Sequence, residues 1–304
     1  MSSLKHEALS SLFWKFLERV GSSLLGLVVQ IILARLLMPD DYGVLAIVVV
    51  FVNLANVFVQ SGLGSAIIQT PRFTKADCST VFWFSIVVAC LFYGMVFFAA
   101  PFIAGFYGND GIIWPLRVLM LTLFLSSLSS IQLAQLTRAL ELKRTFKATL
   151  MALIVSGVVG IASAFLGAGI WALVLQQLVN QAVMCAMLTL ETKWRPEWTF
   201  SPARLKELLS FGWKLLASGL LETGYRSLSD LIVGKQFSVA TLGLVAQGER
   251  YPQTIGSILD GTIQPVMFSA ASRIQDDLEA VKALARRALK TSSFLIVPSM
   301  GCFA

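Results

Sequence analysis

Long apolar segments separated by short polar turns run through the whole chain. A helix that crosses the hydrocarbon core of a bilayer needs about 20 mostly apolar residues. The segments lack the sustained period-two alternation that a membrane β-barrel requires. The pattern predicts an all-α, polytopic membrane protein with about nine membrane helices, the last of them cut short: Phe16–Leu37, Gly43–Leu63, Val81–Phe106, Ile113–Leu136, Ala148–Leu166, Ile170–Leu190, Leu209–Val233, Ala240–Phe268 and Thr291–Ala304.

The composition supports a membrane protein and argues against a metal site. Of the 304 residues, 56% are hydrophobic and only 13% are charged, whereas about 25% are charged in typical soluble domains. His6 is the only histidine, and the four cysteines are scattered without a CxxC pair. We expect the cysteines to be small apolar fillers, and we expect no metal ion and no cofactor.

The net charge of +7 is explained by membrane topology. Cytoplasmic loops of membrane proteins collect Lys and Arg, and here alternate loops do so, whereas the other turns contain only Lys235. The N-terminus is therefore predicted to be cytoplasmic, in a multi-pass protein of the inner (plasma) membrane. The basic loops contain no recognition module, so nucleic acid is not an expected partner. The basic residues on the predicted cytoplasmic side are Lys5, Arg72, Lys75, Arg138, Lys143, Arg144, Lys147, Lys193, Arg195, Arg204, Lys206, Arg273, Lys282, Arg286, Arg287 and Lys290.

A weak internal repeat relates the first two helices to the seventh and eighth. Trp14-Lys15 matches Trp213-Lys214, and the segment 43–46 (GVLA) matches 243–246 (GLVA), at an offset of about 200 residues. Apolar composition alone is the alternative explanation of so short a match. Six helices lie between the starts of the two repeats, and an even number returns the chain to the same side of the membrane. The repeats are therefore predicted to be parallel and related by an axis along the membrane normal.

The repeat predicts two lobes. Residues 1–190 form an N-terminal lobe of six helices, residues 191–208 form a cytoplasmic linker, and residues 209–304 begin the C-terminal lobe. Only two helices and part of a third follow the linker, so the second lobe is expected to be incomplete in this chain. An incomplete lobe would leave charged cavity residues facing lipid, which is unfavourable.

Three charged residues, Glu222, Arg226 and Asp230, lie at a spacing of four in the predicted seventh helix. On an α-helix they fall within an arc of about 80°. Each would cost roughly 2.5–3.5 kcal/mol at the centre of a membrane, so they are expected to face protein or a water-filled cavity. Two interpretations remain open: the stripe lines a hydrated path between the lobes, or it is an internal ion-pair ladder that neutralises itself.

The predicted eighth helix carries Glu249, Arg250 and, further along, Asp260, and Pro252 is expected to kink it. Arg250 and Arg226 fall at comparable depth when counted from the outer ends of their helices. Two guanidinium groups at one level suit a diphosphate, which arginine binds with two parallel hydrogen bonds. The alternative is that Glu249 and Arg250 are partnered locally at the kink.

Further polar residues are candidates for lining the same path. Arg19, at the cytoplasmic start of the first helix, could meet an entering diphosphate or could extend to lipid headgroups. Asn53, Asn56 and Gln60 form an i, i+3, i+7 stripe on the second helix. Amides can bind sugar hydroxyl groups, but they also hydrogen-bond neighbouring helices in ordinary packing. The predicted sixth helix carries four more amides: Gln176, Gln177, Asn180 and Gln181.

Several segments resemble a known family of exporters. LARLLMPDDYGVLA and GLGSAIIQ are similar to the first two helices of the polysaccharide transporter family, and DLIVGKQFSVATLGLVAQGERYPQ with PVMFSAASRIQDD is similar to its seventh and eighth helices. This family belongs to the multidrug/oligosaccharidyl-lipid/polysaccharide exporter superfamily, and the likeness is greatest to the teichuronic acid and colanic acid exporters. The resemblance implies two helical lobes around a central cavity.

The resemblance also implies a function. Such a protein would move undecaprenyl-diphosphate-linked oligosaccharide from the inner to the outer leaflet, with membrane lipids as surroundings and with coupling to a proton or a sodium ion. One alternative is a multidrug cation antiporter of the same superfamily, which would want an acidic cavity without surplus arginine. Another is a non-transporting membrane scaffold, which would gain nothing from buried charges. A transferase is not expected, because the loops lack a paired-carboxylate or metal motif.

Overall fold

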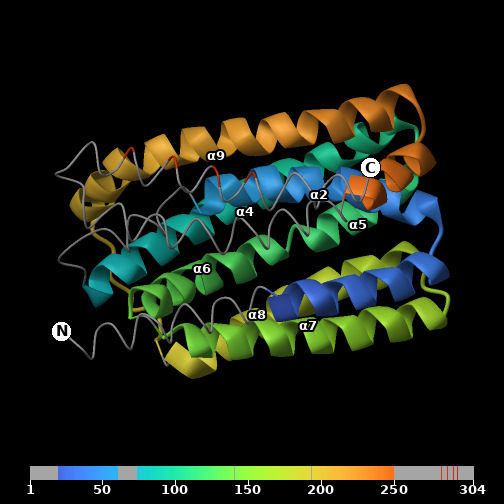
Figure 1. Ribbon diagram of the computed structural model, residues 1–304. Helices are drawn as coiled ribbons and strands as arrows, with labels where there is room; N and C mark the ends of the chain where they lie inside the picture. The colour runs from blue at the N-terminus through green and yellow to red at the C-terminus, as the bar shows by residue number, and fades with distance from the viewer. Residues whose placement is uncertain are drawn as a thin grey trace.

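The computed structural model describes residues 20–60, 74–139, 141–192 and 194–249, together with the isolated positions 282, 286, 290 and 293. Long helices lie side by side in a bundle (Figure 1). They are Val20–Leu36, α2 (Pro39–Gln60), α4 (Lys75–Tyr107), η1 (Asp110–Ile112), α5 (Ile113–Leu119), α6 (Thr122–Arg138), α7 (Leu142–Phe165), α8 (Ile170–Thr192), α9 (Pro202–Gln236) and residues 239–249.

The described residues form an all-α membrane protein, as the sequence predicts. Five of their helical segments are long and apolar enough to cross a membrane: Pro39–Gln60, Ala76–Tyr107, Asp110–Thr137, Lys143–Phe165 and Ile170–Thr192. The predicted seventh membrane helix is present as part of α9, whose charged residues make it more polar than these five. Of the predicted eighth helix only the part up to residue 249 is described, and of the predicted ninth only Ser293.

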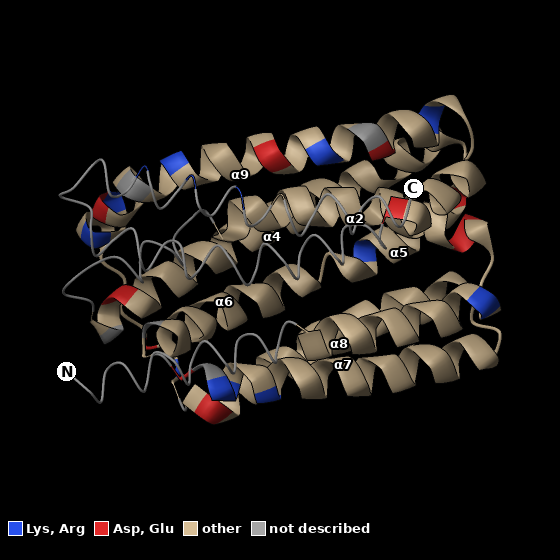
Figure 2. Ribbon diagram, viewed as in Figure 1, with Lys and Arg blue, Asp and Glu red and all other residues tan. Residues whose placement is uncertain are grey.

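The two ends of the bundle differ in their connections. Short turns at residues 37–38, 108–109, 166–169 and 237–238 lie at one end, here called the short-turn end (Figure 1). Ala139 and Glu141, between α6 and α7, and the linker at residues 194–201 lie at the other, here called the basic end. Charged residues gather near both ends, and α9 differs from the other helices in carrying them along its length (Figure 2).

Local sequence signals fix the ends of α4. Thr74 and Asp77 form a capping box, in which the Thr74 hydroxyl accepts a hydrogen bond from the Asp77 backbone N–H and the Asp77 carboxylate accepts one from the Thr74 backbone N–H at 2.9 Å. At the other end, Gly108 adopts the left-handed conformation with φ of 65°. Glycine takes this conformation without a steric penalty, so it ends the helix.

One predicted helix is interrupted. The sequence predicts a single helix over Ile113–Leu136, but the structure divides it into α5 and α6 at Met120. The Thr122 hydroxyl donates to the Leu119 carbonyl at 2.6 Å, and the Ser127 hydroxyl donates to the Leu123 carbonyl at 2.8 Å. Such side-chain bonds compete with the helical ladder and bend helices. An apolar pattern alone does not reveal this competition.

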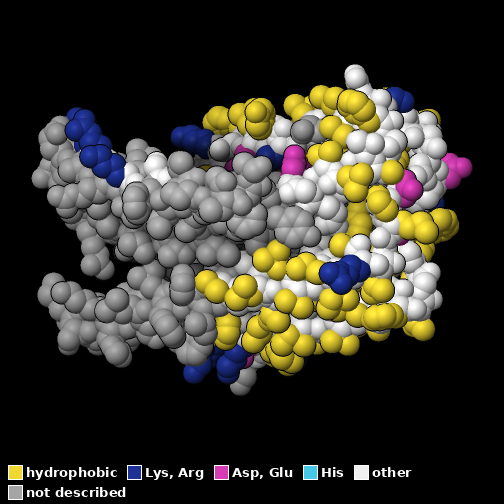
Figure 3. Space-filling view, turned by 45° about the vertical axis from the view of Figure 1, so that its right-hand side comes forward, with side chains coloured by type: hydrophobic (Ala, Val, Ile, Leu, Met, Phe, Trp, Pro, Cys, Tyr) yellow, Lys and Arg dark blue, Asp and Glu magenta, His cyan; other side chains and the backbone are white. Residues whose placement is uncertain are grey.

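The outer surface of α4 suits contact with lipid. Apolar side chains recur on it at intervals of three or four residues and are exposed: Val87, Leu91, Met95, Phe98, Phe102 and Phe106. Hydrophobic side chains also cover much of the described face in Figure 3. By contrast, α2 is packed inside, where it contacts α4, α5, α6, α8 and α9. This central position makes α2 one wall of the site described next.

Candidate functional site

A large polar cavity lies between α2, α9 and the helix at residues 239–249. Its volume is about 990 Å³, which is at the upper end of the roughly 300–1,000 Å³ found for ligand pockets. It combines polar side chains from helices that are far apart in the sequence: Asn53, Asn56, Gln60, Thr223, Arg226, Ser227, Asp230 and Glu249. We call it the central cavity.

The wall formed by α2 presents the predicted amide stripe. Asn53, Asn56 and Gln60 all line the central cavity, because a spacing of three and four residues keeps them on one face of a helix. The Ser126 hydroxyl of α6 lies 2.7 Å from Asn56 Oδ1 and 2.9 Å from the Leu123 carbonyl oxygen, and it has one proton for these two acceptors. When it donates to Asn56, the bond orients that amide at the cavity wall.

The wall formed by α9 carries the predicted charge stripe. Arg226 and Asp230 line the central cavity. Glu222 Oε1 lies 3.0 Å from Arg226 Nη2, and the two side chains are 66% and 69% exposed. An ion pair this exposed contributes little stability, so the guanidinium of Arg226 can exchange Glu222 for another anion at small cost.

The two interpretations of the charge stripe both find support in the geometry. The first step of the ladder is present as the Glu222–Arg226 pair, while Asp230 lines the same cavity as Arg226 and Glu249. Arg19, Arg250 and Asp260 lie outside the described residues. Sequence reasoning missed Thr223, Tyr225 and Ser227, which also line the cavity. Thr223 lies three residues before Arg226, a spacing that places both on one face of the helix, whereas Tyr225 and Ser227 directly flank Arg226 and offered no such signal.

The amides of the predicted sixth helix lie in a second, smaller cavity. It has a volume of about 320 Å³ and is lined by α8 residues together with Asn53 and Asn56 of α2. The two asparagines therefore belong to the walls of both cavities. We call the second one the amide cavity.

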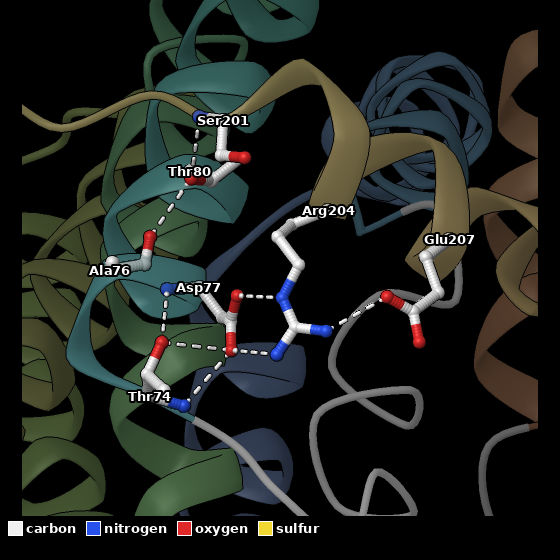
Figure 4. Close-up of polar contacts among 7 residues, drawn as sticks. All are labelled: Thr74, Ala76, Asp77, Thr80, Ser201, Arg204 and Glu207. Atoms are coloured by element: carbon white, nitrogen blue, oxygen red, sulfur yellow. Dashed lines mark hydrogen bonds and ion pairs between the residues drawn. The ribbon is translucent and has the colours of Figure 1, made fainter.

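An ion-pair cluster at the basic end joins α9 to α4 (Figure 4). Arg204 Nε lies 3.1 Å from Asp77 Oδ1, and Arg204 Nη2 lies 3.4 Å from Asp77 Oδ2. Arg204 Nη1 also donates to Glu207 Oε2 at 2.8 Å. The side chain of Asp77 is only 4% exposed. The carboxylates of Glu207 and Asp77 raise the pKa of Arg204, so this guanidinium stays charged.

The linker before α9 is also bound to α4. The backbone N–H of Glu197 donates to the Ser79 hydroxyl at 3.0 Å. The backbone N–H of Ser201 donates to the Thr80 hydroxyl at 3.2 Å, as Figure 4 shows. The rings of Trp83 and Trp198 stack with centroids 4.4 Å apart. These contacts fix where α9 starts, and therefore where Arg226 lies relative to α2.

Comparison with known families identifies the chain. The sequence profile described as "Polysaccharide biosynthesis protein" matches residues 32–304. The chain belongs to this family. The resemblance to polysaccharide exporters found in the sequence is thereby confirmed.

Within the described residues no group of three or more His, Cys, Asp or Glu side chains could hold a metal ion.

Curated relatives of this family member have names that refer to export or synthesis of polysaccharides. The chain is 22% identical over 288 residues to the succinoglycan biosynthesis transport protein ExoT of Rhizobium meliloti (strain 1021), covering 94% of the chain and 58% of the relative. It is 22% identical over 247 residues to the teichuronic acid biosynthesis protein TuaB of Bacillus subtilis (strain 168), covering 80% and 51%. It is 23% identical over 308 residues to the lipopolysaccharide biosynthesis protein WzxC of Escherichia coli (strain K12), covering 98% and 61%.

The chain thus spans between 51% and 61% of the length of these three relatives. No solved structure matches it.

Proposed function

We propose that this protein is a flippase, without enzymatic activity, for polysaccharide biosynthesis. It moves an oligosaccharide linked to a lipid diphosphate from the inner to the outer leaflet of the plasma membrane. The observation that carries the proposal is the central cavity, in which Arg226, Asp230 and Glu249 face the amide stripe of α2. Such charges are costly in a membrane helix unless they serve a hydrated path or a ligand.

The chemistry of the cavity fits an anionic group attached to sugars. Arginine binds phosphate oxygens with two parallel hydrogen bonds. Among the described residues Arg226 forms an ion pair with one carboxylate, that of the exposed Glu222. The carboxylates of Asp230 and Glu249 offset the positive charge in the same cavity. This balance favours release of the lipid after translocation, which a purely cationic cavity would oppose.

The names of the relatives support the same substrate class. ExoT is named for transport in succinoglycan biosynthesis, and WzxC is named for lipopolysaccharide biosynthesis. Because the chain covers only part of each relative, the activity of the whole protein is part of the proposal.

The basic end is proposed to face the cytoplasm. Lys143, Arg144 and Lys147 lie near the start of α7, and such residues are favoured on the cytoplasmic side.

Complementation tests this function. The full-length protein is expressed in a strain that lacks its own flippase for a surface polysaccharide, and cell-surface polymer is quantified. Restored polymer supports the proposal. Absence of polymer, with normal protein levels and with export of cationic dyes instead, would favour the multidrug antiporter.

A further inference from the structure

The amide cavity is polar and uncharged, which is unusual within a bundle of apolar helices. Its lining includes seven amide side chains from three helices: Gln30, Asn53, Asn56, Gln176, Gln177, Asn180 and Gln181. Thr122 and Ser156 add hydroxyl groups, and none of the described residues that line the cavity is charged. We propose that this cavity binds a neutral sugar ring of the lipid-linked substrate; the proposal rests on the flippase function.

The amides have more hydrogen-bonding capacity than the protein uses. Asn180 Nδ2 donates to the Ser156 hydroxyl at 3.1 Å, and Asn56 Oδ1 accepts from Ser126. Gln30 Oε1 is fully buried and has no hydrogen-bond partner among the described residues. Each amide offers two donors and an oxygen with two lone pairs. Amides that served only to join helices would bond one another across the contact rather than surround a space of about 320 Å³.

The chemistry of the lining selects among ligands. A sugar hydroxyl both donates and accepts, so it matches amides and hydroxyl groups. A diphosphate needs cationic donors for strong binding, and hard metal cations favour carboxylate oxygen ligands; the described residues of the lining supply neither. An apolar compound would require a mostly hydrophobic pocket. The remaining alternative to a sugar is that the cavity holds only water, since its volume is that of about ten water molecules in the liquid.

The amide cavity and the central cavity would bind different parts of one substrate. Asn53 and Asn56 line both cavities, so a ligand could extend from one to the other past these two residues. Arg226 in the central cavity suits the diphosphate, and the amides of α8 suit a sugar attached to it. A sugar held in this way would give the transporter a means to distinguish glycans by their hydroxyl groups.

Ligand binding to the full-length protein in proteoliposomes tests the proposal. Saturation-transfer NMR is recorded with a panel of neutral disaccharides and, separately, with inorganic pyrophosphate. The double variant Gln177→Leu, Gln181→Leu is expected to raise the dissociation constant of the bound disaccharide about ten-fold or more, while pyrophosphate binding stays unchanged. The control Gln132→Leu removes a buried amide that bonds Thr189 outside both cavities and should leave disaccharide binding intact.

Two results would overturn the inference. One is that no disaccharide of the panel binds the unmodified protein, which would indicate a chamber that holds water only. The other is disaccharide binding that is equally strong in the Gln177, Gln181 double variant. The pyrophosphate measurement is independent: its loss in Arg226→Gln supports the cationic site, and its persistence counts against the proposed function without deciding the role of the amide cavity.

Discussion

Gly43 of α2 and Gly243 of the helix at residues 239–249 face each other in direct backbone contact. A Cβ atom on Gly43 would overlap the carbonyl oxygen of Val239, and one on Gly243 would overlap that of Pro39 and lie 2.9 Å from the Gly43 nitrogen. Only glycine allows so close an approach. These two glycines are also paired by the internal repeat, so the matching segments meet at this crossing.

Substituting either glycine is expected to force the two helices apart. Gly43→Ala and Gly243→Ala should each lower the free energy of unfolding by about 1–3 kcal/mol, the usual cost of overpacking. Thermal unfolding of the purified full-length protein in detergent measures this change. Gly94→Ala in α4 is the control, since a Cβ there would meet nothing within 4 Å. A melting temperature for Gly43→Ala equal to that of Gly94→Ala would contradict the close contact.

The ion pair between Asp77 and Arg204 should stabilise the folded protein more than the neighbouring pair between Arg204 and Glu207 does. Asp77 is 4% exposed and Glu207 is 63% exposed, and burial reduces screening by water. A double-mutant cycle with Asp77→Asn and Arg204→Gln should give a measurable coupling energy. The cycle with Glu207→Gln should give a smaller one. Equal couplings in the two cycles would disagree with this placement of Arg204.

Ser126 is expected to matter through the amide that it orients. Ser126→Ala removes the hydrogen bond to Asn56, which should cost about 0.5–1.5 kcal/mol of substrate binding and lower polymer export. Ser129→Ala is the matched control on α6, because its hydroxyl bonds only the Leu125 carbonyl of its own helix. Surface polymer is compared at equal protein levels. A similar defect in both variants would mean that bending of α6, and not Asn56, causes the loss.

Much of the fold could be predicted from local sequence, because apolar length decides membrane helices. The break between α5 and α6 could not, since an apolar pattern does not show that the Thr122 hydroxyl bonds the Leu119 carbonyl at this point. In the candidate site, the spacing of four places Glu222 beside Arg226 in any α-helix, and the structure contains this pair.

Local sequence patterns do not show which residue of another helix faces a given residue. The central cavity depends on the packing of α2 against α9, and the Asp77–Arg204 pair joins residues 127 positions apart. The amides of α8 could be recognised as polar, but not as sharing a cavity with Gln30. Contacts between distant segments follow from the whole arrangement of helices.

Cysteine labelling tests the predicted orientation of the helices in the membrane. Cysteines are introduced singly into a variant of the full-length protein that lacks native cysteines, and membrane-impermeant reagents are applied from outside. Asp110→Cys and Ala168→Cys, at the short-turn end, should be labelled, whereas Ser201→Cys at the basic end should not. Asp276→Cys, outside the described residues, is predicted to be cytoplasmic as well. Labelling of Ser201→Cys and Ala168→Cys from the same side would refute the helix count.

We propose that positive charge at Arg226, together with Arg250, holds an anionic diphosphate. The most direct measurement is polysaccharide export by arginine variants of the full-length protein in a flippase-deficient strain, with protein levels checked by immunoblot. Arg226→Lys should retain part of the activity, because lysine keeps the charge but loses the planar fork. Arg226→Gln should abolish export without loss of membrane insertion, because removing a charge eases insertion. Wild-type export by the Arg226→Gln, Arg250→Gln double variant would contradict the claim and leave the ion-pair ladder as the role of the α9 charges.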